Sequence, residues 1–162
     1  TVFYALEEVP ALAFPEATRT EVRNLFLAPD ERGRIEQAAG TGLDSDMLSV
    51  HLGWRGDELL GYAMLDTHMV RTFPEAFLIV LDRAGRVERT HILAFYEPLE
   101  YLPDARWLAK LEGAGLGPGL RLGHKVTAIT GSTLSSVAVV SGLRRALAVY
   151  QELALESGRL PR

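Results

Sequence analysis

Two tandem hairpin patterns in the middle of the chain constrain its fold more than any other feature. Each pattern joins two stretches of strand-forming residues through a short turn that contains glycine. The stretches are residues 48–55 and 58–66, around Gly56-Asp57, and residues 76–82 and 86–95, around Ala84-Gly85. Such patterns are typical of antiparallel strand pairs. We therefore predict an antiparallel sheet of about four or more strands, in an order that the sequence leaves open.

Helical patterns flank these strands on both sides. A short amphipathic helix is expected over residues 18–26, and a second over residues 29–39, which begins at a proline and stops at Gly40. A short helical stretch covers residues 103–111. Apolar residues then recur at helical spacing over residues 135–155, which predicts a long helix with one buried face. Separate strands and helices indicate an α+β fold, with the helices packed on the antiparallel sheet.

The composition suits a single domain. With 162 residues, of which 48% are hydrophobic and 23% charged, the chain can bury a sizeable core. We divide it into a helical N-terminal segment, residues 1–47, packed on the main domain, residues 48–156, and a C-terminal tail, residues 157–162. The net charge of −4 argues against a nucleic-acid binder. The sequence has no cysteine, so a redox role requires a bound cofactor, and no apolar run is as long as a membrane span.

The hydroxyl-rich segment Val126–Ser136 stands where a short apolar run gives way to the long helical pattern. Its small residues let the main chain approach an anion, and its hydroxyls lie beside the unpaired amides of a helix N-terminus. No Asp or Glu occurs from Gly113 to Gln151, a range that contains Arg121, Lys125, Arg144 and Arg145. The last two of these are expected on a solvated helix face. The segment therefore suggests a phosphate site, with simple capping of the helix as the alternative.

The same segment resembles the Ser/Thr-Gly-Ala-Thr flavinylation motif of the FMN-binding domain family. Members of this family include the C subunit of the sodium-translocating NADH:quinone oxidoreductase and the G subunit of the Rnf electron-transport complex. Further stretches of the chain are similar to blocks of the family in the same order, over roughly residues 50 to 150. These stretches are Gly61–Ala63, Asp66–His68 with Arg71, Ala94–Pro103 and Arg106–Leu108.

The resemblance implies a cofactor and the residues that bind it. FMN would be joined by a phosphoester to Thr133, with Thr130, Gly131, Ser132, Leu134 and Ser135 around the attachment. Glu97, Tyr101 and Leu102 would lie against the flavin, and His68 and Arg71 would border its pocket. Two positions depart from the family pattern, because Thr127 replaces the usual Asp and Ser132 the usual Ala. Covalent and non-covalent binding therefore both stay open.

The role implied by the resemblance is that of an electron carrier rather than an enzyme with its own substrate. Residues 48–156 would form the FMN-binding domain, and a flavin transferase would attach the cofactor. The expected partners are membrane redox-complex subunits or other electron carriers. The expected location is extracytoplasmic, with a signal segment or an anchor before Thr1. The alternatives are a non-covalent FMN-binding sensory module and a flavin-free interaction domain.

Other constellations support weaker hypotheses. Glu97 and Glu100 form a carboxylate pair, for which acid–base chemistry is an alternative to flavin contact. The histidines at positions 51, 68, 91 and 124 lack the spacing of a helical metal site, so no metal is expected. The glycine-rich residues 113–119 fit neither the GxGxxG nor the P-loop pattern and are expected to form a connecting loop.

Overall fold

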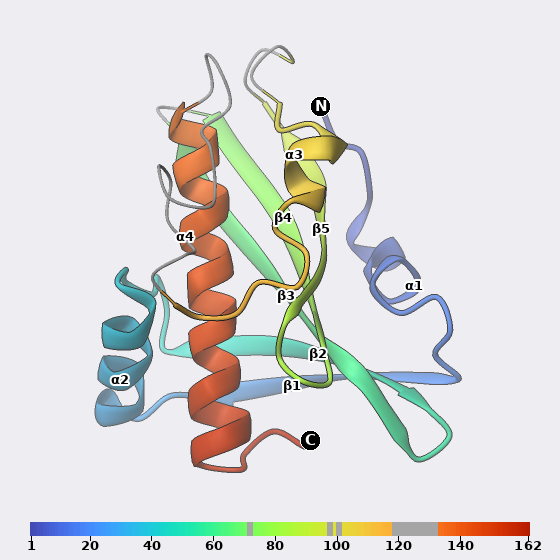
Figure 1. Cartoon of the computed structure of the whole chain (residues 1–162), viewed down its shortest axis with the longest axis vertical. Helices are drawn as coiled ribbons and strands as arrows, with labels where there is room; N and C mark the ends of the chain where they lie inside the picture. The colour runs from blue at the N-terminus through green and yellow to red at the C-terminus, as the bar shows by residue number, and fades with distance from the viewer. Residues whose placement is uncertain (71–72, 97–98, 100–101, 118–132) are drawn as a thin grey trace.

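The chain folds into a five-stranded antiparallel sheet with helices packed on it (Figure 1). The computed structural model describes residues 1–70, 73–96, 99, 102–117 and 133–162. The strands are β1 Arg19–Phe26, β2 Met47–Arg55, β3 Glu58–Val70, β4 Phe73–Asp82 and β5 Val87–Phe95. Each strand pairs antiparallel with the next, so the order is β1-β2-β3-β4-β5. The predicted α+β class and both predicted hairpins are confirmed.

Residues 18–26, which were expected to form a helix, contain β1 instead. β1 pairs with β2 along its whole length, from Arg19 opposite Trp54 to Phe26 opposite Met47. The helix prediction was wrong because a few apolar residues at helical spacing carry little energy in a short segment, whereas a neighbouring strand offers a complete ladder of hydrogen bonds. The first 47 residues therefore contribute a strand to the sheet and are not helical throughout.

The helices are α1 Val9–Ala13, α2 Pro29–Ala39, α3 Ala105–Ala109 and α4 Thr133–Tyr150, with a 3-10 turn, η1 Leu6–Glu8, before α1 and a π-helix, η3 Gln151–Glu156, after α4. Helices α2, α3 and α4 occupy positions that the remaining patterns predicted, whereas η1 and α1, within residues 6–13, were not predicted. α2 ends at Gly40, whose φ of 74° is left-handed and favours glycine. α3 is capped by Asp104, whose carboxylate accepts a hydrogen bond from the Trp107 amide at 2.8 Å.

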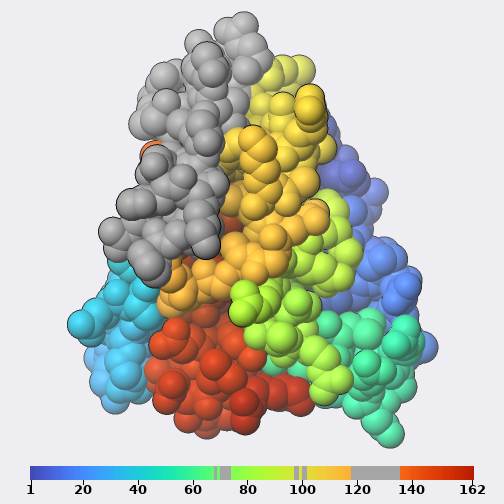
Figure 2. Space-filling view, viewed as in Figure 1, coloured from blue at the N-terminus to red at the C-terminus, as the bar shows by residue number. Residues whose placement is uncertain are grey.

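Helices α4 and α1 pack on opposite faces of the sheet. Side chains alternate between the two faces of a strand, so Tyr62 of β3 belongs to the core under α4, while Ala63 belongs to the smaller core under α1. Leu143 and Leu147 of α4 are both buried in the larger core. α2 lies beside α4 (Figure 1), and the segment that follows α3, drawn in orange in Figure 2, covers the middle of α4.

The C-terminal tail packs against the larger core. Leu160 is buried, and the Tyr62 hydroxyl donates a hydrogen bond to the Pro161 carbonyl at 2.5 Å. Burial of this phenol raises the pKa of Tyr62 to about 12. Arg159 donates to the Glu31 carboxylate at 2.7 Å and to the Phe26 carbonyl at 3.1 Å. The tail therefore connects the start of α2 and the end of β1 to the larger core, on the face of the sheet that α4 covers.

Replacing Gly53 with alanine tests the packing of α1 on the sheet. A Cβ atom at Gly53 would lie 2.3 Å from Cγ of the buried Phe14, so we expect Gly53→Ala to lower the free energy of unfolding by about 1–3 kcal/mol. Gly33→Ala is the matched control, because nothing lies within 4 Å of its Cβ position and Gly33 is inside α2. We expect this control to raise the free energy of unfolding by about 0.5–1 kcal/mol. Urea denaturation measures both, and a Gly53→Ala protein as stable as the parent would contradict the described packing of Phe14.

Candidate functional site

The register of the sheet brings two of the predicted site segments together at one end. His68 of β3 lies opposite Glu75 of β4, and Glu75 lies opposite Phe95 of β5. The last residues of β3 and of β5 are therefore separated by a single strand. The segment that follows β5 contains Leu102, which is half-buried and whose amide donates to the Leu99 carbonyl at 3.1 Å.

The start of α4 lies at the same end of the molecule. α4 runs antiparallel to β3, because the Tyr150 ring packs on Tyr62 with centroids 5.3 Å apart and Arg145 contacts Asp66, which is further along β3. The four steps along the chain from Asp66 to Val70 span about 13 Å in a strand, and the nine steps from Gly142 back to Thr133 span about 13.5 Å in a helix. Thr133, the first residue of α4, is therefore level with the end of β3; Figure 1 shows the start of α4 at this end of the sheet.

The described residues include part of the predicted site. Thr133 is the first residue of α4, Leu134 and Ser135 follow it in the first turn, and His68 lies in β3. The predicted residues that lie outside the described ranges are Thr130, Gly131, Ser132, Glu97, Tyr101 and Arg71. The structure therefore describes only the last four residues of the hydroxyl-rich segment, residues 133–136.

The N-terminal turn of α4 has the electrostatics that an anion requires. The first turn contains no acidic residue, so no carboxylate within this turn compensates the positive end of the helix dipole. The Ser136 side chain is fully buried in the same turn. An uncompensated helix N-terminus favours a bound phosphate through its free amides and its dipole.

A cavity of about 380 Å³, which we call the wedge cavity, lies beside α4 where β2 and β3 part. Their pairing runs from Arg55 opposite Glu58 only as far as His51 opposite Ala63. Beyond that pair β2 continues with β1, and β3 continues with β4. The cavity is lined by the two strand segments, by the loop after α2 and by the helix residues Gly142, Arg145, Ala146 and Val149. Its volume is in the range of small-molecule sites, and its lining is mixed, as such sites require.

An ion pair between β3 and α4 forms one wall of the wedge cavity. Arg145 donates to Asp66 Oδ1 from Nη2 at 2.8 Å and from Nε at 3.1 Å. The two side chains are only 20% and 13% exposed, so water screens the pair poorly. A Cβ atom at Gly142 would lie 2.7 Å from Asp66 Oδ2, so a glycine at this position lets the carboxylate approach the helix.

The expectation that Arg144 and Arg145 occupy a solvated helix face is wrong. Besides the contact of Arg145 with Asp66, Arg144 donates to the carbonyl oxygens of Ala39 at 2.6 Å, Ala38 at 3.3 Å and Gly117 at 3.2 Å. Two of these carbonyls belong to the last turn of α2, which has no partners for them within its own helix. The adjacent arginines therefore join α4 to three different parts of the chain, and none of these partners is near them in sequence.

Glu75 is a candidate site residue that the sequence analysis missed. Its side chain is only 1% exposed, and it lies in β4 between His68 and Phe95 in the register. A continuous apolar run, residues 76–81, directly follows it in the sequence, as is typical of a strand buried on both faces. A carboxylate in an otherwise apolar series is rarely buried without a specific role. Its position marks the same end of the sheet as the start of α4.

Two histidines have pKa values that the protein lowers. Burial lowers the pKa of His51, and burial together with the nearby Arg89 lowers that of His91. His51 Nδ1 and His91 Nε2 are buried without a hydrogen-bond partner among the described residues. In the described part of the chain, no three His, Asp or Glu side chains are grouped as a metal site would need.

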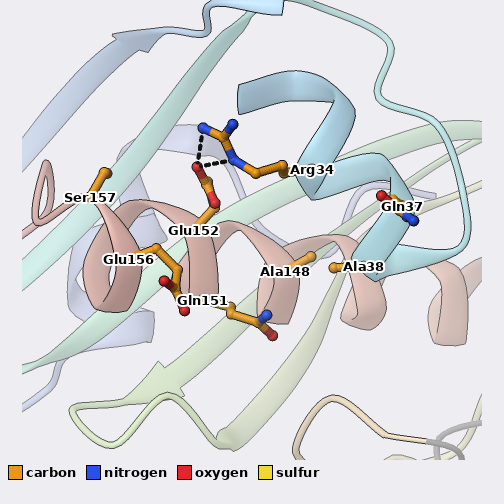
Figure 3. A pocket seen from close by; sticks show the side chains of 8 residues that line it. All are labelled: Arg34, Gln37, Ala38, Ala148, Gln151, Glu152, Glu156 and Ser157. Atoms are coloured by element: carbon orange, nitrogen blue, oxygen red, sulfur yellow. Dashed lines mark hydrogen bonds and ion pairs between the residues drawn. The ribbon is translucent and has the colours of Figure 1, made fainter. Parts of the chain in front are cut away.

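A larger groove of about 570 Å³ lies between α2 and the C-terminal end of α4 with η3 (Figure 3). Arg34 of α2 and the buried Glu152 of η3 form an ion pair of 2.7 Å at its side. The hydrogen bond to Glu152 raises the pKa of Arg34, so the guanidinium stays charged. This groove is at the opposite end of α4 from Thr133. We therefore favour the smaller wedge cavity, which adjoins Asp66 and Thr67, as the candidate site.

Comparison of the sequence with models of protein families and with curated proteins finds no significant match. Among the described ranges, none of the helices has the length and apolarity needed to cross a bilayer.

Arg145→Met tests the ion pair beside the wedge cavity. The substitution keeps an apolar stem but removes a charge partner from a largely buried carboxylate, so we expect the free energy of unfolding to fall by about 1–3 kcal/mol. Arg55→Met is the matched control, because Arg55 is 52% exposed and its two carboxylate contacts are 3.5 Å long. We expect a change within about 0.5 kcal/mol for this control. Equal effects of the two substitutions in urea denaturation would contradict the described burial of the Asp66–Arg145 pair.

The pH dependence of stability tests the burial of the two histidines. Because their folded pKa values lie below the ordinary value of 6.5, the unfolded chain binds more protons as the pH falls through this region. Their contribution is present above pH 6.5 and is lost toward the lower folded values. We expect the free energy of unfolding to decrease from about pH 7 to about pH 5.5, and less steeply in the His51→Gln/His91→Gln protein. An identical slope in the two proteins would show that both imidazoles are freely solvated.

Proposed function

We propose that this chain is an FMN-binding electron-transfer protein whose flavin is attached by a phosphoester to Thr133. The observation that supports the proposal is that Thr133 is the first residue of α4 and lies level with the end of β3. The ends of β3 and β5 and the start of α4, which contain described residues of three of the family-like blocks, thus lie at one end of the fold although they are far apart in sequence. The wedge cavity adds space for a small molecule beside the same helix, beginning at Gly142, about two and a half turns from Thr133.

The first turn of α4 has a defined role in the proposed site. It favours the phosphate through the amides of a helix N-terminus and the helix dipole, because the turn itself contains no acidic residue. A phosphodiester keeps one negative charge, which this turn stabilises by about 0.3–1 kcal/mol if exposed. That energy alone would not retain a cofactor in dilute solution. The covalent bond is therefore the feature that keeps the flavin on the protein.

The attachment reaction can be written with balanced atoms. The Thr133 hydroxyl oxygen forms a bond to the FMN phosphorus of FAD, the pyrophosphate bond to AMP breaks, and the hydroxyl proton leaves to solvent. A magnesium-dependent flavin transferase catalyses this step in the proposal. When bound, the flavin supplies one-electron chemistry, and the protein tunes it through hydrogen bonds and packing.

Exposed apolar residues at the same end offer a contact surface for a redox partner. Met69 is 62% exposed, Leu99 57% and Tyr96 45%. Apolar side chains gathered near a site are typical of surfaces that bind other proteins. We propose that the partners are membrane redox-complex subunits or other electron carriers on the outer face of the membrane.

Intact-mass measurement of denatured protein tests the proposed attachment. The chain is produced together with a flavin transferase that accepts it, and we expect the parent protein to carry the mass of one esterified FMN after denaturation. Thr133→Ala should remove this mass completely, because no other oxygen would be joined to phosphorus. Ser132→Ala is the matched control, with an adjacent hydroxyl removed, and should keep the mass.

Other outcomes of the same measurement would overturn the proposal in different ways. Retention of the mass in Thr133→Ala would place the phosphoester on another residue. A yellow protein that releases its flavin on denaturation would support the non-covalent alternative. A colourless protein from cells in which the transferase flavinylates a control substrate would support the flavin-free interaction domain.

A further inference from the structure

The two edge strands of the sheet, β5 and β1, differ in whether another segment of the chain covers them. The outer edge of β5 is covered by the N-terminal segment, since Val2 forms a β-bridge with Ala94 and the Phe3 amide donates to the Leu93 carbonyl at 2.8 Å. The outer edge of β1 has no such cover among the described residues. An uncovered edge strand presents unpaired amide and carbonyl groups to any strand that can approach it.

The hydrogen bonds around β1 show which of its residues face outward. The Leu27 amide donates to the Asp46 carbonyl at 2.7 Å, and these two residues continue the register that places Phe26 opposite Met47. In an antiparallel pair the bonding residues alternate, so the odd-numbered residues of β1 bond to β2. The Phe26 carbonyl accordingly points away and accepts from Arg159 at 3.1 Å. Thr20, Val22 and Asn24 therefore direct their main-chain groups outward.

We propose that β1 pairs antiparallel with β1 of a second copy of this chain, with Val22 opposite Val22. In this register the outward main-chain groups of Thr20 and Asn24 meet each other across the pair, so every outward group from Thr20 to Asn24 has a partner. The two sheets become one continuous sheet. The inference is independent of the proposed flavin chemistry.

The charges of β1 select this register. With Val22 at the centre, Glu21 lies opposite Arg23 of the second copy, and the two-fold symmetry repeats the contact. A shift by two residues in either direction brings Glu21 opposite Glu21 or Arg23 opposite Arg23. A shift by one residue places a residue whose main-chain groups point outward opposite one whose main-chain groups bond to β2, so the hydrogen bonds between the two copies cannot form. Opposite charges directly across a pair stabilise it, and like charges destabilise it.

The side chains on β1 are available for these contacts. The Glu21 and Arg23 side chains are 32% and 39% exposed, and Val22 is 50% exposed. Glu21 Oε1 accepts from the Trp54 indole at 2.8 Å, which orients the carboxylate. Oε2 lies 3.6 Å from Nε of Arg23 in the same strand, which is longer than a hydrogen bond. Only one strand contributes on each side, so the interface is small, and the association is expected to be weak and dependent on concentration.

Sedimentation equilibrium of the full chain with complementary charge variants tests the proposal. We expect a reversible monomer–dimer equilibrium for the parent protein. Arg23→Glu and Glu21→Arg should each raise the dimer dissociation constant at least about tenfold, because each places like charges opposite each other twice. An equimolar mixture of the two variants should restore dimerisation, since the two carboxylates on β1 of the first variant then face the two guanidinium groups on β1 of the second.

Val22→Pro is the backbone control. Its missing amide is one that points outward, so the β1–β2 ladder stays complete, while the central pair of the proposed dimer is lost. Circular dichroism checks that each variant is folded. The proposal is overturned if the parent protein is monomeric up to its solubility limit, if a folded Val22→Pro protein still dimerises, or if the mixed charge variants stay monomeric.

Discussion

The packing of α4 against β3 determines where every part of the candidate site lies. Tyr150 contacts Tyr62, and Arg145 contacts Asp66. These two contacts fix the antiparallel direction of α4 relative to β3 and the position of the helix along the strand. Because of this alignment, the helix begins where β3 ends. A helix shifted by one turn would carry the start of α4 about 5.4 Å away from that level.

Small residues and buried charges set this alignment together. Gly142 allows the Asp66 carboxylate to reach the helix surface, and Arg144 holds the end of α2 against the same helix. The positive charges of α4, Arg144 and Arg145, are thus both used in contacts with other elements. The first turn of the helix contains no acidic residue. The helix therefore uses its arginines for structure and leaves its N-terminus as the group that favours an anion. The separation of β2 and β3 adds the wedge cavity beside the middle of the helix, from Gly142 onward.

The sequence predicted the elements that are determined by residues within or next to them, such as turn glycines and helix-capping residues. The two hairpins follow from glycine-containing turns, and α2 follows from a proline at its start and Gly40 at its end, so their predicted bounds match the structure closely. β1 was mistaken for a helix because its stability comes from β2, which is more than twenty residues away in sequence. The partners of Arg144 and Arg145 are likewise remote, in α2 and β3, so their burial had no sequence signal. Glu75 did carry a sequence signal, because it directly precedes the continuous apolar run of residues 76–81. Six predicted site residues, among them Ser132 and Glu97, lie outside the described ranges, so their roles stay predictions.

The central claim is that a flavin phosphate becomes a diester on the oxygen of Thr133. Phosphorus NMR of the native, flavin-loaded protein tests this claim directly, because a phosphate monoester has a second ionisation near pH 6 and a diester has none. We expect one phosphorus resonance whose chemical shift stays constant between about pH 5 and pH 8. A resonance that titrates near pH 6 would show that the FMN phosphate is free, and would contradict the account.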